Sequence, residues 1–252
     1  MQTNATLQEQ LILEHIKKLE TAEKNFLPFV RHVWPEFISG YHHRKIAKKF
    51  EDIASGKIKR LIVNMPPRHT KSEFASYLLP AWFLGRFPEK KIIQTAHTAE
   101  LSVGFGRKVR NLVYSDDYKS VFPSLGLRSD SKAAGRWSTS KNGEYFAIGV
   151  GGAVTGKGAD LLIIDDPHSE QEGQSADAGV FDRVYDWYTS GPRQRLQPGG
   201  AICVVMTRWS KKDLTGQILK SSIQRGGSDE WEIIELPAIL PSGNPLWPSF
   251  WP

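Results

Sequence analysis

The side chains best suited to chemistry lie in one stretch of the sequence, LIVNMPPRHTKSEF at residues 61–74. An apolar run leads into two prolines, and Lys71 and Ser72 then open a segment with helical character. A loop between a strand and a helix can bind phosphate, because its backbone N–H groups turn inward and the helix dipole favours negative charge. The lysine would reach the terminal phosphates, and the Ser72 hydroxyl would bind Mg²⁺. The expected nucleotide-binding residues are Pro67, Arg68, His69, Thr70, Lys71 and Ser72.

The loop lacks the glycines that such loops usually carry. The pattern G-x-x-x-x-G-K-[ST] places Met65 and Thr70 at its two glycine positions. If Thr70 keeps the positive φ that glycine adopts easily, its branched side chain costs about 1–2 kcal/mol. Pro66 and Pro67 would supply rigidity where other loops rely on glycine. A plain strand–turn–helix with a solvated Lys71 is the alternative, and this loop alone does not decide between the two.

A second pattern, ADLLIIDDPHSE at residues 159–170, is an apolar strand that ends in two adjacent carboxylates. Asp165 and Asp166 point in different directions, because side chains alternate along a strand. Ligands of open α/β sheets bind at the edge formed by the carboxyl ends of the strands. There, one carboxylate can hold Mg²⁺ while the other polarises an attacking water. A turn or a helix cap is the alternative, but together with the loop the pair predicts a P-loop ATPase that uses ATP and Mg²⁺.

A third apolar strand, within AICVVMTRWSKKDLTG at residues 201–216, has Thr207 at its end. In translocating ATPases, a polar residue on the strand beside the acidic strand senses the γ-phosphate, and Thr207 is the candidate for this role. A hydroxyl that caps an expected helix at 211–221 is the alternative.

These motifs lie among short apolar runs separated by helix-length segments. The runs are continuous rather than alternating, which indicates strands of a mainly parallel sheet covered on both faces. The expected fold class is therefore α/β, a P-loop NTPase (RecA/ASCE-like) three-layer sandwich with a mainly parallel central sheet. The expected strands are 60–65, 91–96, 144–149, 161–166, 201–206 and 231–236, and the expected helices between them are 71–84, 98–114 and 176–190.

The chain before this sheet has helical character. Residues 6–22 and 41–55 show helical apolar spacing. The aromatic run 26–37 between them is expected to be a packed connector, interrupted by Pro28 and Pro35. We therefore expect an N-terminal helical extension, 1–40, followed by one ATPase domain, 41–252.

Composition narrows the class of protein without deciding it. The 252 residues carry 33 Lys and Arg against 27 Asp and Glu, a net charge of +6, which permits a polyanionic partner but does not demand one. Cys203 is the single cysteine, which excludes a disulfide within the chain, and its apolar neighbours predict a buried structural thiol. No apolar run approaches the roughly 20 residues of a membrane span, and the N-terminus lacks the pattern of a signal peptide. We expect a cytosolic protein.

In this order and spacing, the motifs resemble the ATPase domain of the large terminase subunit of tailed bacteriophages. The likeness is carried by MPPRHTKSEFAS, GVGGAVTGKGADLLIIDDPH and VVMTRWSKKDLTGQIL, and it extends over residues 26–250. It implies ATP hydrolysis that drives double-stranded viral DNA into a procapsid, by a ring of subunits docked on the portal. It also implies a small terminase subunit as a partner, and a place in the cytoplasm of the infected bacterium rather than in the mature virion.

The resemblance also implies roles for single residues. The phosphate loop of similar terminases often reads P-P-R-H-G-K-S, which Arg68 and Lys71 match and Thr70 does not. Asp165 then stands at the Mg²⁺-binding carboxylate, together with Ser72. The expected catalytic residues are Asp166, which stands where other members have a glutamate, Arg68 and Thr207, with Glu170 as a reserve for Asp166.

The family joins its ATPase to a C-terminal nuclease, and no further acidic strand follows residue 236 here. DNA cleavage is therefore not expected of this chain, and the tail LPSGNPLWPSFWP reads as a chain cut in mid-course. Two alternatives remain: a related helicase-type ATPase, and a DNA-binding or assembly module with a degenerate, weakly active P-loop.

Weaker signals concern residues outside these motifs. Lys157, in the glycine-rich run 149–160, is expected to face the polyanion. His42 and His43, adjacent on a helix, are not expected to share one face. Candidates for an arginine that acts across a subunit boundary are Arg107, Arg110, Arg193 and Arg195, and candidates for stacking on adenine are Phe37, Tyr41, His42 and His43.

Overall fold

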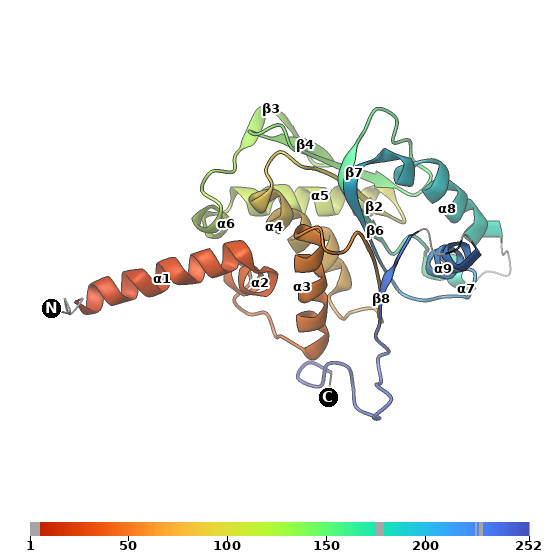
Figure 1. Ribbon diagram of the computed structural model, residues 1–252, viewed down its shortest axis with the longest axis horizontal. Helices are drawn as coiled ribbons and strands as arrows, with labels where there is room; N and C mark the ends of the chain where they lie inside the picture. Colours follow the sequence, from red (N-terminus) through yellow and green to blue (C-terminus); the bar gives the residue numbers. More distant parts are fainter. Residues whose placement is uncertain (1–5, 175–178, 225, 227–228, 252) are drawn as a thin grey trace.

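The described part of the protein, in a computed structural model, comprises residues 6–174, 179–224, 226 and 229–251. It contains an eight-stranded sheet with the strand order β3-β4-β5-β2-β6-β7-β1-β8 (Figure 1). In chain order the strands are β1 (Arg60–Asn64), β2 (Lys91–Ala96), β3 (Leu127–Ala133), β4 (Arg136–Thr139), β5 (Glu144–Gly149), β6 (Ala159–Asp165), β7 (Leu196–Met206) and β8 (Glu232–Glu235).

Six neighbouring strands, from β5 to β8 in the sheet order, are parallel. The central strands β1, β6 and β7 each contain a continuous apolar run, at 61–63, 161–164 and 201–206, and every residue of these runs is buried. Such runs form strands that are covered on both faces. The predicted mainly parallel sheet is thus confirmed.

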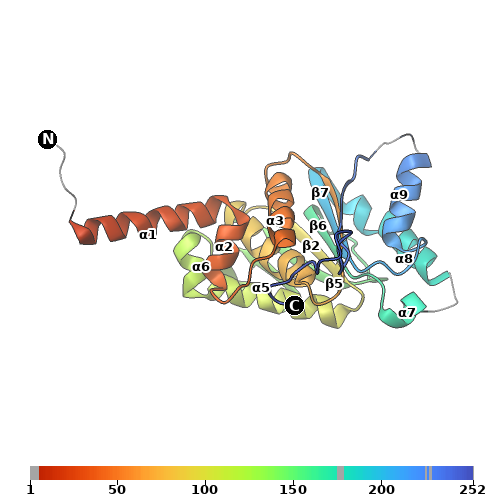
Figure 2. The same ribbon diagram turned by 90° about the horizontal axis from the view of Figure 1, so that it is seen from below.

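Helices cover both faces of the sheet, and Figure 2 shows the sheet lying between them. On one face the core is formed mainly by α2, α3, α4 and α5, and on the other mainly by α8 and α9. The helices are α1 (Leu7–Lys24), α2 (Phe26–Val33), α3 (Tyr41–Ala54), α4 (Leu79–Arg86), α5 (Ala99–Tyr114), α6 (Asp116–Val121), α7 (Glu170–Gln174), α8 (Gly179–Ser190) and α9 (Leu214–Gln224), with a π-helical turn η1 (Glu73–Leu78) and a 3₁₀ turn η2 (Pro192–Arg195).

The predicted strands and helices are present with small shifts in their bounds. The expected helix 176–190 is seen as α8, and its first three residues lie outside the described part. The pair β3 and β4 is absent from the prediction. Both strands are antiparallel at one edge of the sheet, where exposed polar residues interrupt the apolar runs that mark the central strands.

The prediction of a packed connector at 26–37 is wrong for its first eight residues, which form α2. Pro28 is the third residue of this helix, and a proline in the first turn removes no helical hydrogen bond. Phe26, Phe29 and Val30 are buried in the main core. The division of the chain at residue 40 stays a prediction.

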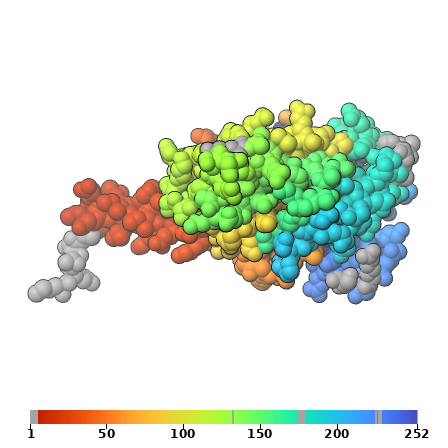
Figure 3. All heavy atoms as spheres, turned by 90° about the horizontal axis from the view of Figure 1, so that it is seen from above, coloured from red at the N-terminus to blue at the C-terminus, as the bar shows by residue number. Residues whose placement is uncertain are grey.

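Helix α1 projects from the body of the molecule (Figures 2 and 3). The Thr6 side chain accepts a hydrogen bond from the Glu9 backbone N–H, and the Glu9 side chain bonds back, so that a capping box fixes its start. Within α1 only Ala22 is buried. No helix in the described part of the chain is both long and apolar enough to cross a bilayer.

The segment after β8 returns beneath α3 (Figure 1). Trp247 is buried there, with its ring centre 5.4 Å from that of His42 and 4.8 Å from that of His43. The end of the described chain thus packs beside the loop that follows β1, where the Trp251 ring centre lies 6.5 Å from that of His69.

Candidate nucleotide-binding site

The three predicted motifs meet at one edge of the sheet. Strand β7 lies between β1 and β6, and its residue Met206 pairs with Asn64 while Val205 pairs with Asp165. All three strands are parallel, so their carboxyl ends reach the same level, where ligands of α/β sheets bind. The loop that follows β1 therefore faces the carboxylates at the end of β6.

Lys71 and Asp166 form an ion pair across this edge. The Lys71 Nζ is 2.7 Å from Asp166 Oδ2, and the lysine side chain is 6% exposed against 36% for the aspartate. The other oxygen of Asp166 accepts a hydrogen bond of 2.8 Å from the backbone N–H of Thr207. Asp166 has φ of 38°, a left-handed value that aspartate tolerates better than most residues. Its carboxylate is thus held between the phosphate loop and the end of β7.

Asp165 points the other way and is buried. Its two oxygens accept hydrogen bonds from Ser72 Oγ at 2.9 Å and from Ser76 Oγ at 2.7 Å. The serines are four residues apart, which places both hydroxyls on one side of the helix. Burial, and then the negative charge of Asp166, raise the pKa of Asp165 to about 7, against the opposing effect of the two hydroxyls and Lys71.

Ser76 continues into a buried polar chain that sequence reasoning missed. Gln94 donates from Nε2 to Ser76 Oγ at 3.0 Å, and Tyr145 donates to Gln94 Oε1 at 3.3 Å. All three side chains are buried. A glutamine within the apolar run KIIQTA, and a serine four residues after Ser72, are the signals that could have revealed it.

The oxygens of Asp165 and Ser72 suit a magnesium ion. Mg²⁺ prefers one or two carboxylates, together with phosphate and water oxygens, in octahedral geometry. Two adjacent ligands at 2.0–2.1 Å from such an ion lie roughly 3 Å apart, and Asp165 Oδ1 and Ser72 Oγ are 2.9 Å apart. The donor set therefore fits the group that the sequence predicts.

The loop keeps the backbone conformation that glycine usually provides. Arg68 has φ of 59° and Thr70 has φ of 65°. For a β-branched residue this is an outlier, with an intrinsic cost of about 1–2 kcal/mol. The Phe74 N–H bonds to the Thr70 carbonyl, so Thr70 accepts the first helical hydrogen bond, and the N–H groups of the first turn after it have no helical carbonyl to bind. These groups are available to an anion.

The other residues of the loop divide between surface and interior. Pro67 and Arg68 are exposed. His69 is buried, its Nδ1 lies 2.8 Å from the Pro67 carbonyl oxygen, and its ring faces that of Trp251 at 6.5 Å. Arg68 is thus exposed to solvent, whereas His69 packs the loop onto the body of the protein.

The alternative for Thr207, capping of the following helix, is wrong because Asp213 fills that place. Asp213 is fully buried and accepts from the backbone N–H of Gly216 at the start of α9. Its other oxygen accepts from Arg208 Nε and from the N–H groups that follow. Thr207 stays half-buried beside a pocket of about 210 Å³ that also borders Pro66.

Several weaker expectations are changed by the geometry. Lys157 faces Glu144, with Nζ 3.0 Å from Oε2, and its side chain is only 13% exposed, so it does not face a polyanion. Glu170 is exposed at the start of α7 and accepts from Gln174. Arg193 is bound to Asp229, which also pairs with Arg60 at the amino end of β1.

The candidates for adenine stacking are mostly inaccessible. Phe37, His42 and His43 are buried, while Tyr41 is 57% exposed. The rings of His42 and His43 lie against each other with centres 3.7 Å apart, contrary to the expectation that they would not share a face. Trp247 covers both, which the spacing of the histidines alone does not reveal.

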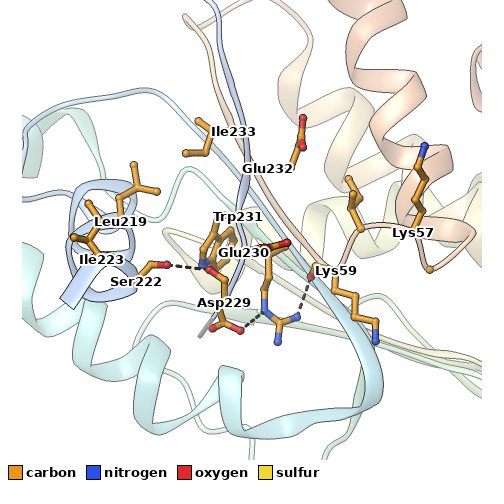
Figure 4. Close-up of a pocket in the computed structure, with 13 residues that line it drawn as sticks. Lys57, Lys59, Leu219, Ser222, Ile223, Asp229, Glu230, Trp231, Glu232 and Ile233 are labelled. Carbon is orange, nitrogen blue, oxygen red and sulfur yellow. Dashed lines mark hydrogen bonds and ion pairs between the residues drawn. The ribbon is translucent and has the colours of Figure 1, made fainter. Parts of the chain in front are cut away.

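A pocket of about 890 Å³ lies at the opposite edge of the sheet (Figure 4). Its lining includes Lys59, Asp229 and Trp231, and it borders the amino end of β1, whereas the phosphate loop follows the carboxyl end. This cavity is therefore separate from the candidate nucleotide site.

The sheet order and the loop between β1 and its helix define a fold of the P-loop NTPase type. Among solved structures, the chain is similar to the crystal structure of the HK97 bacteriophage large terminase, with a TM-score of 0.50 and 15% identity over 90% of this chain and 44% of that one. It also matches the large terminase of a thermophilic bacteriophage in complex with ADP, with a TM-score of 0.43 and 11% identity over 75% of this chain and 44% of that one.

The HK97 likeness confirms the fold that the sequence motifs predicted, that of a phage large terminase. At 15% identity it shows the fold alone, and the weaker match to the terminase of the thermophilic phage adds nothing to it. The chain spans less than half the length of either terminase. No family model and no curated protein matches the chain.

Proposed function

We propose that this chain is the ATPase part of a large terminase, which hydrolyses ATP to drive double-stranded DNA into a procapsid. The observation that carries the proposal is the convergence of Lys71, Ser72, Asp165 and Asp166 at one edge of the sheet, with ion-pair and hydrogen-bond distances of 2.7–2.9 Å. The fold shared with a phage large terminase supports it. The net charge of +6 is compatible with a polyanionic partner.

Each side chain has a task that its position suits. Lys71 and the N–H groups of the first helical turn bind the terminal phosphates. Asp165 and Ser72 would hold Mg²⁺, which when bound would neutralise the charge that develops on the phosphate oxygens. Asp166, fixed by the Thr207 N–H, orients the attacking water and accepts its proton.

The ion pair between Lys71 and Asp166 gives the site an order of events. An ammonium held 2.7 Å from a carboxylate must exchange that partner for phosphate when the nucleotide enters. Asp166 is then released from Lys71, while the N–H of Thr207 still holds its other oxygen. The carboxylate thus becomes available to a water when phosphate occupies the loop. Arg68, exposed on the loop, approaches the γ-phosphate from the solvent side.

The partners in this proposal are those of a packaging motor. They are the portal of the procapsid, a small terminase subunit, further copies of the chain in a ring, and DNA held through its phosphates, in the cytoplasm of an infected bacterium. A motor that moves along DNA needs contacts that ignore sequence and weaken with salt. Strong preference for one duplex sequence at physiological salt would contradict this part.

A turnover assay with Mg²⁺, ATP and double-stranded DNA tests the proposed activity. Lys71→Ala removes the cation that meets the transferred phosphate, and kcat should fall roughly 10²–10³-fold, as for other single groups that stabilise developing charge. Lys90→Ala is the matched control, because Lys90 also pairs with an aspartate, Asp160 at 2.9 Å, but at the amino end of β2. It should turn over like the wild type.

The competing function is a DNA-binding or assembly module whose loop is inactive. Two observations favour it: Thr70 stands where other loops have glycine, and Lys71 is already paired with Asp166. Under that reading, wild type and Lys71→Ala are equally inert and neither binds Mg²⁺ and ATP. These two results together would reject the proposed ATPase function and leave the DNA-binding or assembly function.

A further inference from the structure

The phosphate loop has a left-handed backbone at a residue that resists it. Thr70 has φ of 65°, in a region that favours glycine. A β-branched side chain stays there only when its surroundings hold it. The contacts of the Thr70 side chain therefore decide whether the loop keeps its shape.

A chain of three hydrogen bonds supplies such contacts. The backbone N–H of Gly40 donates to His43 Nδ1 at 2.7 Å, and His43 Nε2 lies 2.6 Å from Thr70 Oγ1. Thr70 Oγ1 in turn donates to the carbonyl of His69 at 2.6 Å. Since Nδ1 is an acceptor, the proton of the neutral ring is on Nε2, and His43 donates to Thr70. Each donor in these three hydrogen bonds thus has an acceptor.

The imidazole of His43 has little freedom to leave this position. It is fully buried, and its ring centre lies 4.7 Å from that of Phe37, 4.9 Å from that of Phe74 and 4.8 Å from that of Trp247. Burial lowers the pKa of His43 to about 2, so the ring stays neutral at physiological pH. A rigid donor from α3 is thereby fixed against the loop.

We propose that His43 is a positioning residue, which holds Thr70 in the left-handed conformation and so does the work that glycine does in other phosphate loops. The effect on nucleotide binding rests on the function proposed above. His43 and Thr70 depend on each other. A loop with a branched residue at position 70 needs the hydrogen-bond donor of His43, whereas a loop with glycine at that position does not. The contribution of His43 should therefore disappear when residue 70 is glycine.

A double-mutant cycle tests this dependence. The affinity for a fluorescent ATP analogue with Mg²⁺ is measured for His43→Leu in the wild-type and in the Thr70→Gly background. We expect His43→Leu to weaken binding about tenfold in the presence of Thr70, which corresponds to about 1.4 kcal/mol, and to have little effect beside Gly at position 70. An equal loss in both backgrounds would overturn the proposal.

The matched control is His42→Leu. His42 is the neighbouring residue, is equally buried and lies against the His43 ring, but the ring that bonds to Thr70 Oγ1 is that of His43. Whatever this change costs, the cost should be the same in both backgrounds. Thr70→Val keeps the branched side chain and removes the hydroxyl, so it should weaken nucleotide binding as much as His43→Leu. It tests the same hydrogen bond if His43→Leu folds poorly.

Urea unfolding of the same variants without nucleotide separates this inference from the proposed function. Thr70→Gly should shift the folding equilibrium toward the folded state about tenfold more in the His43→Leu background than in the wild type. If this coupling is present while no variant binds nucleotide, the proposed function fails and the role of His43 stands. If the coupling is absent, His43 does not position Thr70.

Discussion

The hydroxyl of Ser76 offers a sharp test of how the buried carboxylate of Asp165 is stabilised. Ser76 Oγ lies 2.7 Å from Asp165 Oδ2, and both side chains are buried. A hydrogen bond to a charged group contributes about 1.5–3 kcal/mol, against about 1 kcal/mol for a neutral pair. Gln94 also loses an acceptor at 3.0 Å, although its Nε2 keeps a second one at the Thr95 carbonyl. We therefore expect Ser76→Ala to lower the free energy of unfolding by about 2–3 kcal/mol.

The measurement is urea unfolding at pH 8, followed by tryptophan fluorescence, without nucleotide. Ser102→Ala is the control, because Ser102 is as deeply buried and donates at the same distance, 2.7 Å, to the neutral backbone carbonyl of Ile148. It should cost about 1 kcal/mol. In an Asp165→Asn background, where no charge remains to be stabilised, the cost of Ser76→Ala should fall to that of the control. Equal costs for Ser76→Ala and Ser102→Ala in the unaltered chain would refute the reasoning.

Two further predictions concern other buried groups. Burial lowers the pKa of His42 to about 4 from its ordinary 6.5, so the unfolded chain takes up a proton first as the pH falls from about 6.5 to 4, and stability should drop by up to roughly 1.4 kcal/mol per pH unit. His42→Phe should flatten this part of a stability–pH profile measured by urea unfolding, and an unchanged slope would contradict it. Asp213→Ala, which removes the acceptor of four hydrogen-bond donors, should lower the free energy of unfolding by about 2–4 kcal/mol. The exposed Asp130→Ala is its control in the same unfolding series and should change little.

The parts of the fold that sequence could reveal are those whose signal is local. Continuous apolar runs and the turn residues around them are enough to predict β1, β6 and β7, because buried parallel strands must be apolar on both faces. Strand β3 at the edge of the sheet and β4 beside it lack such a run, and β4 joins the sheet by pairing with β5, a contact made only after folding. Helix α2 escapes the sequence pattern because prolines usually mark a break, although Pro28 lies in the first turn, where it is tolerated.

The candidate site shows the same division. Lys71, Ser72 and the two aspartates follow from motif and strand order, and the structure brings them together. Ser76 and His43 belong to no such motif, and their partners Asp165 and Thr70 lie 89 and 27 residues away along the chain. Their signal is a polar group among apolar neighbours, which shows that a partner exists without showing which one.

The central position of Cys203 has a practical consequence. Its side chain is fully buried on β7, between β6 and β1, as the sequence predicted, and burial raises the pKa of its thiol. A thiol reagent can reach it only when neighbouring strands separate, and the same opening exposes the thiol to water and removes the burial that raises its pKa. The single cysteine of this sequence is thus a natural reporter. The rate at which it gains the mass of a label measures how often the middle of the sheet opens, with no engineered probe.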